Sequence, residues 1–167
     1  MSDLERLADR LAIQDVLCRY ARGIDRCDEQ LLRGVWWPGA EVDYGSGFSD
    51  AGEWSANVVV ALGTMRRTQH FLGNMLIDID GDRATAETYC RAYHEVDGAE
   101  APQEMEVGGR YLDKLEKRGG EWRIANRRYV HDWNRNIAST AAWDGPMYGT
   151  LTRVGARLPN DPSYTGA

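Results

Sequence analysis

The 167-residue sequence has too few cysteines and apolar runs for several protein classes. Its three cysteines, Cys18, Cys27 and Cys90, are odd in number and lack the spacing of a metal knuckle or a redox pair. We therefore expect reduced thiols, as in a cytoplasmic protein. No apolar run approaches the roughly 18 residues of a membrane helix, and the charged start MSDLERLADR is unlike a signal peptide.

Basic charge and cofactor motifs are also scarce. Lysine and arginine total 20 against 26 aspartates and glutamates, and the net charge of -6 argues against a nucleic-acid partner. No glycine loop for a nucleotide is found. A metal site built from His70, His94 and His131 is an alternative, but no H-x-x-x-H or C-x-x-C spacing supports it. These absences argue against a nucleic-acid partner, a nucleotide cofactor and a bound metal.

The composition and the first third of the chain predict a globular domain that begins with helices. Hydrophobic residues make up 43% and charged residues 28% of the chain, which is typical of one folded domain. Ser2 and Glu5 have the spacing of a capping box, which predicts a helix over residues 3–23 with Gly23 as its terminator. Two more helices are predicted after the capping aspartates Asp28 and Asp50, over residues 29–35 and 51–65.

The middle of the chain has the pattern of an antiparallel meander. Alternating, β-branched and aromatic residues predict strands, and Gly119-Gly120 suits a tight hairpin turn that needs positive φ. Helices followed by strands predict an α+β domain over residues 1–135, whose curved sheet wraps the first helix around a pocket. We expect residues 136–167 to form an irregular tail that packs on the body or on a neighbouring subunit. The predicted strands cover residues 40–45, 68–79, 84–96, 104–117 and 121–134.

Asp25 and His70 are the leading candidates for chemistry. Asp25 stands at the end of the first predicted helix, where the helix dipole disfavours an anion, and His70 lies in the apolar segment TQHFLGNML. A carboxylate that accepts from Nδ1 of a histidine leaves Nε2 free to act as a general base near neutral pH. The alternatives are an aspartate that is solvated or paired with Arg22 or Arg26, and a histidine in an ordinary core.

Three segments make the chain resemble a known family. The start LADRLAIQDVLCRYARGIDRCD, the later WWPGAEVDYG and the still later GGEWRIANRRYVHDW are together similar to SnoaL-like proteins of the nuclear transport factor 2-like superfamily. The resemblance covers residues 4–135 and implies a cone in which helices pack on a strongly curved, mostly antiparallel sheet. Within the superfamily the chain most resembles the branch of scytalone dehydratase, bile acid 7α-dehydratase and hexachlorocyclohexane dehydrochlorinase.

The resemblance implies roles for particular residues. Asp25 and His70 match the Asp–His pair of this branch, while Tyr20 and Tyr44 match tyrosines of its dehydratases. Arg127 matches an arginine beyond a W-x-I strand motif. Three further residues are candidates for the substrate pocket: His94, if its register turns it toward the helices, Arg128, if the match slips by one residue, and Trp133, if it lies at the mouth.

Helix and strand geometry limits which of these residues share a pocket. Tyr20 lies about 140° from Asp25 around an ideal helix, so the two converge only if the helix end deviates. Arg127 and Arg128 are adjacent on a predicted strand and point to opposite faces, so only one of them enters the cone. An arginine inside the cone needs an anionic partner, which is either a ligand or an acid such as Asp43.

The resemblance implies a cofactor-independent lyase of the dehydratase or dehydrohalogenase type, acting on a small, largely apolar cyclic, polyketide-like or steroid-like substrate. His70 is the expected base, and loss of water or halide gives an alkene. Alternatives with the same fold are an enolate-forming isomerase or cyclase, a ligand-binding module without chemistry, and the small subunit of a ring-hydroxylating dioxygenase. The resemblance also implies a homo-oligomer, a trimer rather than a dimer.

Overall fold

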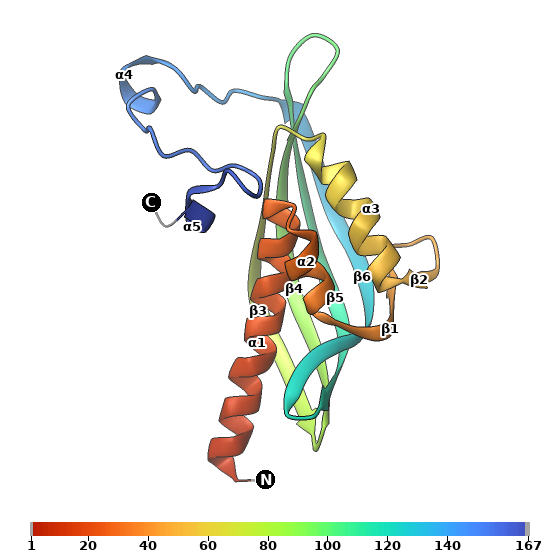
Figure 1. The fold of residues 1–167 in the computed structure, drawn as a ribbon. Coiled ribbons are helices and arrows are strands. Elements are labelled where there is room, and N and C mark those ends of the chain that lie inside the picture. Colours follow the sequence, from red (N-terminus) through yellow and green to blue (C-terminus); the bar gives the residue numbers. More distant parts are fainter. Residues whose placement is uncertain (1, 166–167) are drawn as a thin grey trace.

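Three helices cover one face of a long, curved sheet in the computed structural model, which describes residues 2–165 (Figure 1). The chain forms the long first helix, two shorter helices with a short hairpin between them, and then a meander of four long strands. The elements are α1 (Asp3–Arg26), α2 (Glu29–Gly34), β1 (Trp36–Asp43), β2 (Phe48–Asp50), α3 (Ala51–Gly63), β3 (Arg67–Asp80), β4 (Arg83–Val96), β5 (Gln103–Arg118), β6 (Glu121–Ala138), α4 (Gly145–Tyr148) and α5 (Pro162–Thr165).

The six strands form one mixed sheet in the order β2-β1-β6-β5-β4-β3. Neighbouring strands run antiparallel except β1 and β6, which pair in parallel from Trp36 opposite Ile124 to Asp43 opposite Arg128. Helices followed by an antiparallel meander make this an α+β fold, and the curved sheet confirms the predicted cone.

Helix α1 lies along β3, an edge strand with one side left free of strand pairing. Arg10 of α1 donates to the carbonyls of Ile77 (3.1 Å) and Met75 (3.3 Å). Nearer the other end of the helix, the backbone N–H of His70 donates to Asp25 Oδ2 at 2.8 Å. Side chains of α1 thus form hydrogen bonds with backbone groups on the unpaired edge of β3. These bonds hold the C-terminal end of the helix against the start of β3.

The predicted helix starts are confirmed. Ser2 and Glu5 form both halves of a capping box, with the Ser2 N–H donating to Glu5 Oε2 at 2.6 Å. Asp28 caps α2 and Asp50 caps α3, and each carboxylate accepts a backbone N–H three residues later at 2.9 Å. These local patterns fix where each helix begins because they satisfy amide groups that have no partner inside the helix.

Gly23 does not end α1, contrary to the sequence prediction. The helix continues to Arg26, and Cys27 adopts the left-handed conformation that terminates it (φ 49°). Gly23 instead allows close packing, because a Cβ at this position would lie 3.1 Å from the Leu32 Cβ of α2. The longer helix places Asp25 within its last turn.

The meander confirms the four long predicted strands, each with slightly wider bounds. Gly119 and Gly120 both have positive φ (60° and 87°), as the hairpin between β5 and β6 requires. The first strand begins at Trp36 rather than at residue 40, because its parallel pairing with β6 starts there. The three-residue strand β2 was not predicted, and its exposed residues carry no hydrophobic alternation.

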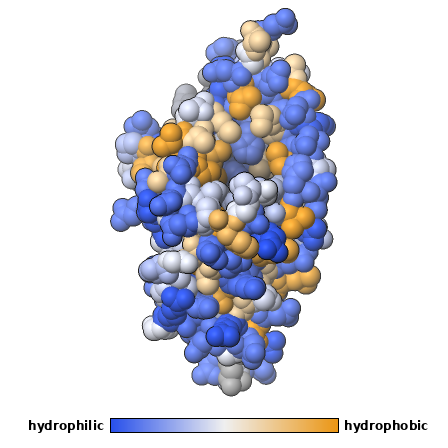
Figure 2. Space-filling view, turned by 90° about the vertical axis from the view of Figure 1, so that its right-hand side faces the viewer, coloured by the Kyte–Doolittle hydropathy of each residue, from blue (hydrophilic) through white to orange (hydrophobic). Residues whose placement is uncertain are grey.

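The core fills the space between the helices and the inner face of the sheet. Helix α1 contributes Ile13, Leu17 and Ile24, and the sheet contributes Trp36 and Ile124, all almost fully buried. Burial of each such side chain stabilises the fold by about 1.5–3 kcal/mol. On the face that contains α3, apolar residues lie in small groups among hydrophilic ones (Figure 2).

Strand β6 runs to Ala138, and the tail begins after it. The tail leaves the top of the sheet, includes the one-turn helices α4 and α5, and returns to the C-terminal end of α1 (Figure 1). There Arg26 binds Asp161 at 2.8 Å, and the Tyr164 hydroxyl donates to Asp28 at 2.8 Å. Within the described residues, no helix has the length and apolar character needed to cross a membrane.

Candidate active site

Asp25 and His70, 45 residues apart in the sequence, form a two-point contact. His70 Nδ1 lies 2.8 Å from Asp25 Oδ1, and the His70 backbone N–H donates to Asp25 Oδ2 at 2.8 Å. Their side chains are only 10% and 8% exposed, respectively. Because Asp25 occupies Nδ1 and fixes the strand next to it, both the tautomer and the orientation of the imidazole are determined by one carboxylate.

The Asp25 carboxylate is held in its charged form. Burial raises the pKa of this carboxyl, but the hydrogen bonds and charge of His70, with help from Thr68, outweigh burial and hold the pKa below its ordinary 3.8. Asp25 is therefore an anion at neutral pH and stabilises positive charge on His70. This is the electrostatic arrangement that a histidine base needs when it accepts a proton.

His94 lies beside His70 and settles a register that the sequence leaves open. It pairs with Thr68 across β3 and β4, faces the helices, and sets its ring perpendicular to that of His70, with centroids 5.4 Å apart. Burial, followed by the charge of His70, lowers the pKa of His94 to about 4. His94 Nδ1 is buried without a hydrogen-bond partner among the described residues. His94 is thus a neutral imidazole at pH 7 with an unused polar atom.

Arg127 is the arginine that enters the cone, and it is fully buried. Its Nε and Nη2 donate to the two carboxylate oxygens of Asp113 at 2.6 and 2.7 Å. Its guanidinium carbon lies 3.8 Å from the centroid of Tyr20 and 4.1 Å from that of Tyr111. The anionic partner is therefore an acid of the protein, while Nη1 has no hydrogen-bond partner among the described residues.

Tyr20 and Tyr44 meet through their hydroxyl groups next to Arg127. Tyr44 stacks between Trp54 (4.8 Å between centroids) and Tyr129 (5.3 Å). Burial raises the pKa of the Tyr20 and Tyr44 hydroxyl groups, and that of Tyr44 lies well above 10. Both remain protonated at neutral pH and can donate hydrogen bonds.

Arg128 and Trp133 do not belong to this site, which corrects the prediction that they contact substrate. Arg128 follows Arg127 on β6 and points to the outer face, where it is 56% exposed and lies 3.6 Å from Asp43. Trp133 pairs with Gly108 after a register shift in β5 and β6 and covers that glycine, also on the outer face. The shift could not be counted from the sequence, and it turns Trp133 away from the helices.

A cavity of about 930 Å³ lies on the other side of this region, between the tail and the outer face of the sheet. Thr68 and Arg157 belong both to its wall and to the surroundings of Asp25. The space between the helices and the sheet, where the sequence predicts a pocket, holds the stacked side chains of Tyr20, Arg127 and Tyr111. The described residues include no group of three or more His, Cys, Asp or Glu side chains placed to hold a metal ion.

Sequence reasoning missed three residues around the site. Asp113 could have been found, because it shares the inward alternation of Tyr111 and Leu115 on β5, where an acid is unusual. Thr68 and Arg157 gave no such signal: one is a small polar residue at a strand start, and the other lies in an irregular tail.

An α+β cone of helices on a curved, mixed, six-stranded sheet is the fold of the nuclear transport factor 2-like class. Comparison with protein families gives the particular family: the SnoaL-like domain matches residues 5–128. The chain belongs to the SnoaL-like family.

Individual relatives agree with this assignment. Hexachlorocyclohexane dehydrochlorinase 1 of Sphingobium indicum is 27% identical over 133 residues, covering 75% of this chain and 82% of the relative. The crystal structure of LinA superposes with a TM-score of 0.76 at 22% identity, over 87% of this chain and all of that chain. A scytalone dehydratase-like protein of Novosphingobium aromaticivorans gives a TM-score of 0.70 at 22% identity, over 82% and 93% of the two chains. The structural likeness establishes the shared fold.

Proposed function

We propose that the protein is a cofactor-independent lyase that eliminates water or halide from a small, largely apolar cyclic substrate. The contact of 2.8 Å between Asp25 Oδ1 and His70 Nδ1, in a buried setting, carries this proposal. It supplies a general base of fixed tautomer beside a fixed anion. The similarity to hexachlorocyclohexane dehydrochlorinase supports elimination as the reaction class.

In the proposed reaction, His70 Nε2 takes a proton from carbon. The electron pair of that C–H bond forms the new C=C bond, and the bond to the leaving group on the next carbon breaks. A halide departs with its bonding pair, whereas a hydroxyl departs as water after receiving a proton from Tyr44, which solvent restores. Asp25 stabilises the imidazolium of His70 until its proton passes to solvent.

The remaining site residues would receive the leaving group and the substrate. Arg127 Nη1 is a buried donor without a protein partner, so a halide or oxyanion beside it relieves an unmet hydrogen bond. Tyr20 holds the Tyr44 hydroxyl in place and faces the same guanidinium. His94 offers a neutral ring next to His70, suited to hydrogen bonding with a substrate oxygen.

The test is elimination from γ-hexachlorocyclohexane and from a panel of cyclic β-hydroxy ketones, followed by chloride release and by alkene absorbance. We expect turnover that falls by about 10²–10⁴-fold in His70→Ala and in Asp25→Asn, because both remove the oriented base. His131→Ala, which removes an exposed histidine of β6, should leave turnover unchanged. An equal loss of turnover in all three variants, or unchanged turnover in His70→Ala, would refute His70 as the base.

Deuterated water separates elimination from enolate formation. An isomerase or cyclase would exchange the acidic C–H of a ketone without releasing water or halide, because the same base would act with no leaving group. Ligand binding that survives His70→Ala with no turnover or exchange on any substrate would indicate a binding module instead. Co-purification of a larger partner would indicate a non-catalytic subunit.

A further inference from the structure

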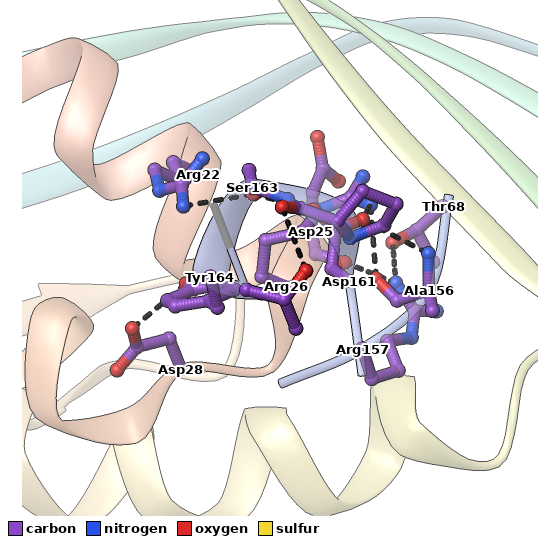
Figure 3. A network of polar contacts seen from close by, with 12 residues as sticks. Arg22, Asp25, Arg26, Asp28, Thr68, Ala156, Arg157, Asp161, Ser163 and Tyr164 are labelled. Atoms are coloured by element: carbon purple, nitrogen blue, oxygen red, sulfur yellow. Dashed lines mark hydrogen bonds and ion pairs between the residues drawn. The ribbon is translucent and has the colours of Figure 1, made fainter. Parts of the chain in front are cut away.

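The C-terminal tail caps the helix that carries Asp25. The last carbonyls of an α-helix have no partner within the helix. Here Arg157 Nη1 donates to the carbonyl of Asp25, and the Leu158 N–H donates to that of Arg26 at 2.8 Å. Two successive tail residues thereby satisfy two successive carbonyls at the end of α1, and Figure 3 shows Arg157 beside Asp25 and Thr68.

Arg157 ties together three elements that determine where Asp25 and His70 lie. Besides the Asp25 carbonyl on α1, its Nη1 donates to Thr68 Oγ at 2.7 Å, two residues before His70 on β3. Its Nη2 donates to the Leu62 carbonyl at the end of α3 at 3.2 Å. A planar guanidinium reaches these acceptors at fixed angles, which a lysine ammonium on a flexible stem does not.

The charge of Arg157 also offsets an unfavourable position of Asp25. A carboxylate in the last turn of a helix faces the negative end of the helix dipole, whereas a cation there is favourable. Arg26, the other cation of this turn, is already engaged by Asp161 at 2.8 Å. Among the described residues, Arg157 forms no ion pair with a carboxylate, so its charge acts on the helix end.

We propose that Arg157 is a positioning residue for the Asp25–His70 pair, acting through the Asp25 backbone and Thr68. This inference rests on the proposed function of that pair. The alternative is that Arg157 only anchors the tail. The tail has separate anchors for that purpose, including Tyr164 to Asp28 (2.8 Å) and Ser163 with Arg22 (3.0 Å), and neither anchor involves Arg157 (Figure 3).

Proton NMR tests the inference without any substrate. The His70 Nδ1–H is hydrogen-bonded to Asp25 and protected from solvent by burial. It should therefore exchange slowly and give a low-field resonance that is absent from His70→Ala. We expect this resonance to broaden or vanish in Arg157→Ala, to persist weakened in Arg157→Lys, and to remain unchanged in Tyr164→Phe. The Tyr164→Phe variant is the matched control, because it removes a tail anchor and leaves Arg157 in place.

Kinetics and chemical rescue provide a second readout. Arg157→Ala should lower kcat by about 10- to 100-fold, as misplacement of a reacting group does, with little change in KM. Added guanidinium at low concentration should restore part of the lost kcat in Arg157→Ala and none in Arg157→Ala combined with His70→Ala. Tyr164→Phe should show neither the loss nor the rescue.

The outcomes separate this inference from the proposed function. A wild-type protein without the His70 resonance would contradict the Asp25–His70 pair itself. A wild-type resonance that is unchanged in Arg157→Ala, together with unchanged kcat, would overturn the role of Arg157 alone. The same result follows if Arg157→Ala and Tyr164→Phe lose activity equally and guanidinium rescues neither.

Discussion

At the scale of single residues, His94 links the site to the stability of the protein. Burial next to His70 lowers the pKa of His94 to about 4, whereas an unfolded chain restores the ordinary value of 6.5. As pH falls below 6.5, His94 binds a proton in the unfolded state, whereas in the folded state it stays neutral until the pH approaches 4. Acid therefore favours unfolding through this residue, and the effect is complete only below pH 4.

His94→Gln should consequently make the protein less sensitive to acid. The two pKa values correspond to a loss of about 2 kcal/mol in unfolding free energy between pH 7 and pH 5 through His94. Urea unfolding of both proteins at the two pH values measures the difference. If the substituted protein loses as much stability as the original, His94 is charged in the folded state and the lowered pKa is wrong.

The Arg127–Asp113 pair is a second residue-scale feature with a large expected effect. Both side chains are fully buried, so Asp113→Asn leaves a guanidinium without its counter-charge. We expect a destabilisation of about 3–5 kcal/mol, measured by urea or thermal unfolding. Glu29→Gln is the matched control: it makes the same acid-to-amide change in the exposed pair Glu29–Arg33 and should cost below about 0.5 kcal/mol. Similar effects in both variants would mean that water reaches Arg127.

At the scale of elements, much of the fold could be predicted because its signals are local. The aspartate caps, the β alternation and the paired glycines of the β5–β6 hairpin each act within a few residues. The parallel pairing of β1 with β6 and the end of α1 were not predictable in the same way. Both depend on contacts between segments distant in sequence, such as Gly23 against Leu32.

Substitution by alanine should change the stability of the protein in opposite directions at two glycines. Gly120 has φ 87°, which an alanine adopts only with strain, so Gly120→Ala should destabilise the protein by about 1 kcal/mol. Gly63 ends α3 in helical conformation with open space around its Cα, so Gly63→Ala should stabilise it by up to about 1 kcal/mol. Thermal unfolding of both variants measures the two changes. A stabilised Gly120→Ala would show that residue 120 does not have a positive φ in the hairpin turn.

Only part of the candidate site could be predicted from the sequence, because its residues meet through contacts between distant segments. Asp25 and His70 could be paired only because the family resemblance supplied a contact across 45 residues, which local patterns do not contain. Strand alternation separated Arg127 from Arg128 but could not say which one faces inward. Arg157 stayed invisible, because a lone arginine in an irregular tail has no periodicity to place it.

At the scale of the whole molecule, the trimer that the family resemblance implies remains a prediction, and the outer face of the sheet allows it to be tested. Phe71 (69% exposed), Tyr89 and Trp133 leave large apolar area on the outer face of the sheet, which a second copy can cover. Light scattering should give roughly 56 kDa, three times the chain mass of 18.8 kDa. Phe71→Glu should shift this mass toward the single chain, whereas Leu4→Glu, at an exposed apolar position of α1, should not. A single-chain mass for the unaltered protein would exclude the trimer.

The docking of the tail on α1 has a consequence for biosynthesis. During translation, residues 3–26 leave the ribosome long before residues 157 and 158 are joined to the chain. A polypeptide that stops before Arg157, or is cleaved by a protease between the sheet and Arg157, lacks the protein donors to the Asp25 and Arg26 carbonyls. We therefore expect the proposed Asp25–His70 pair to reach its final geometry only after Arg157 has been synthesised and has docked on α1.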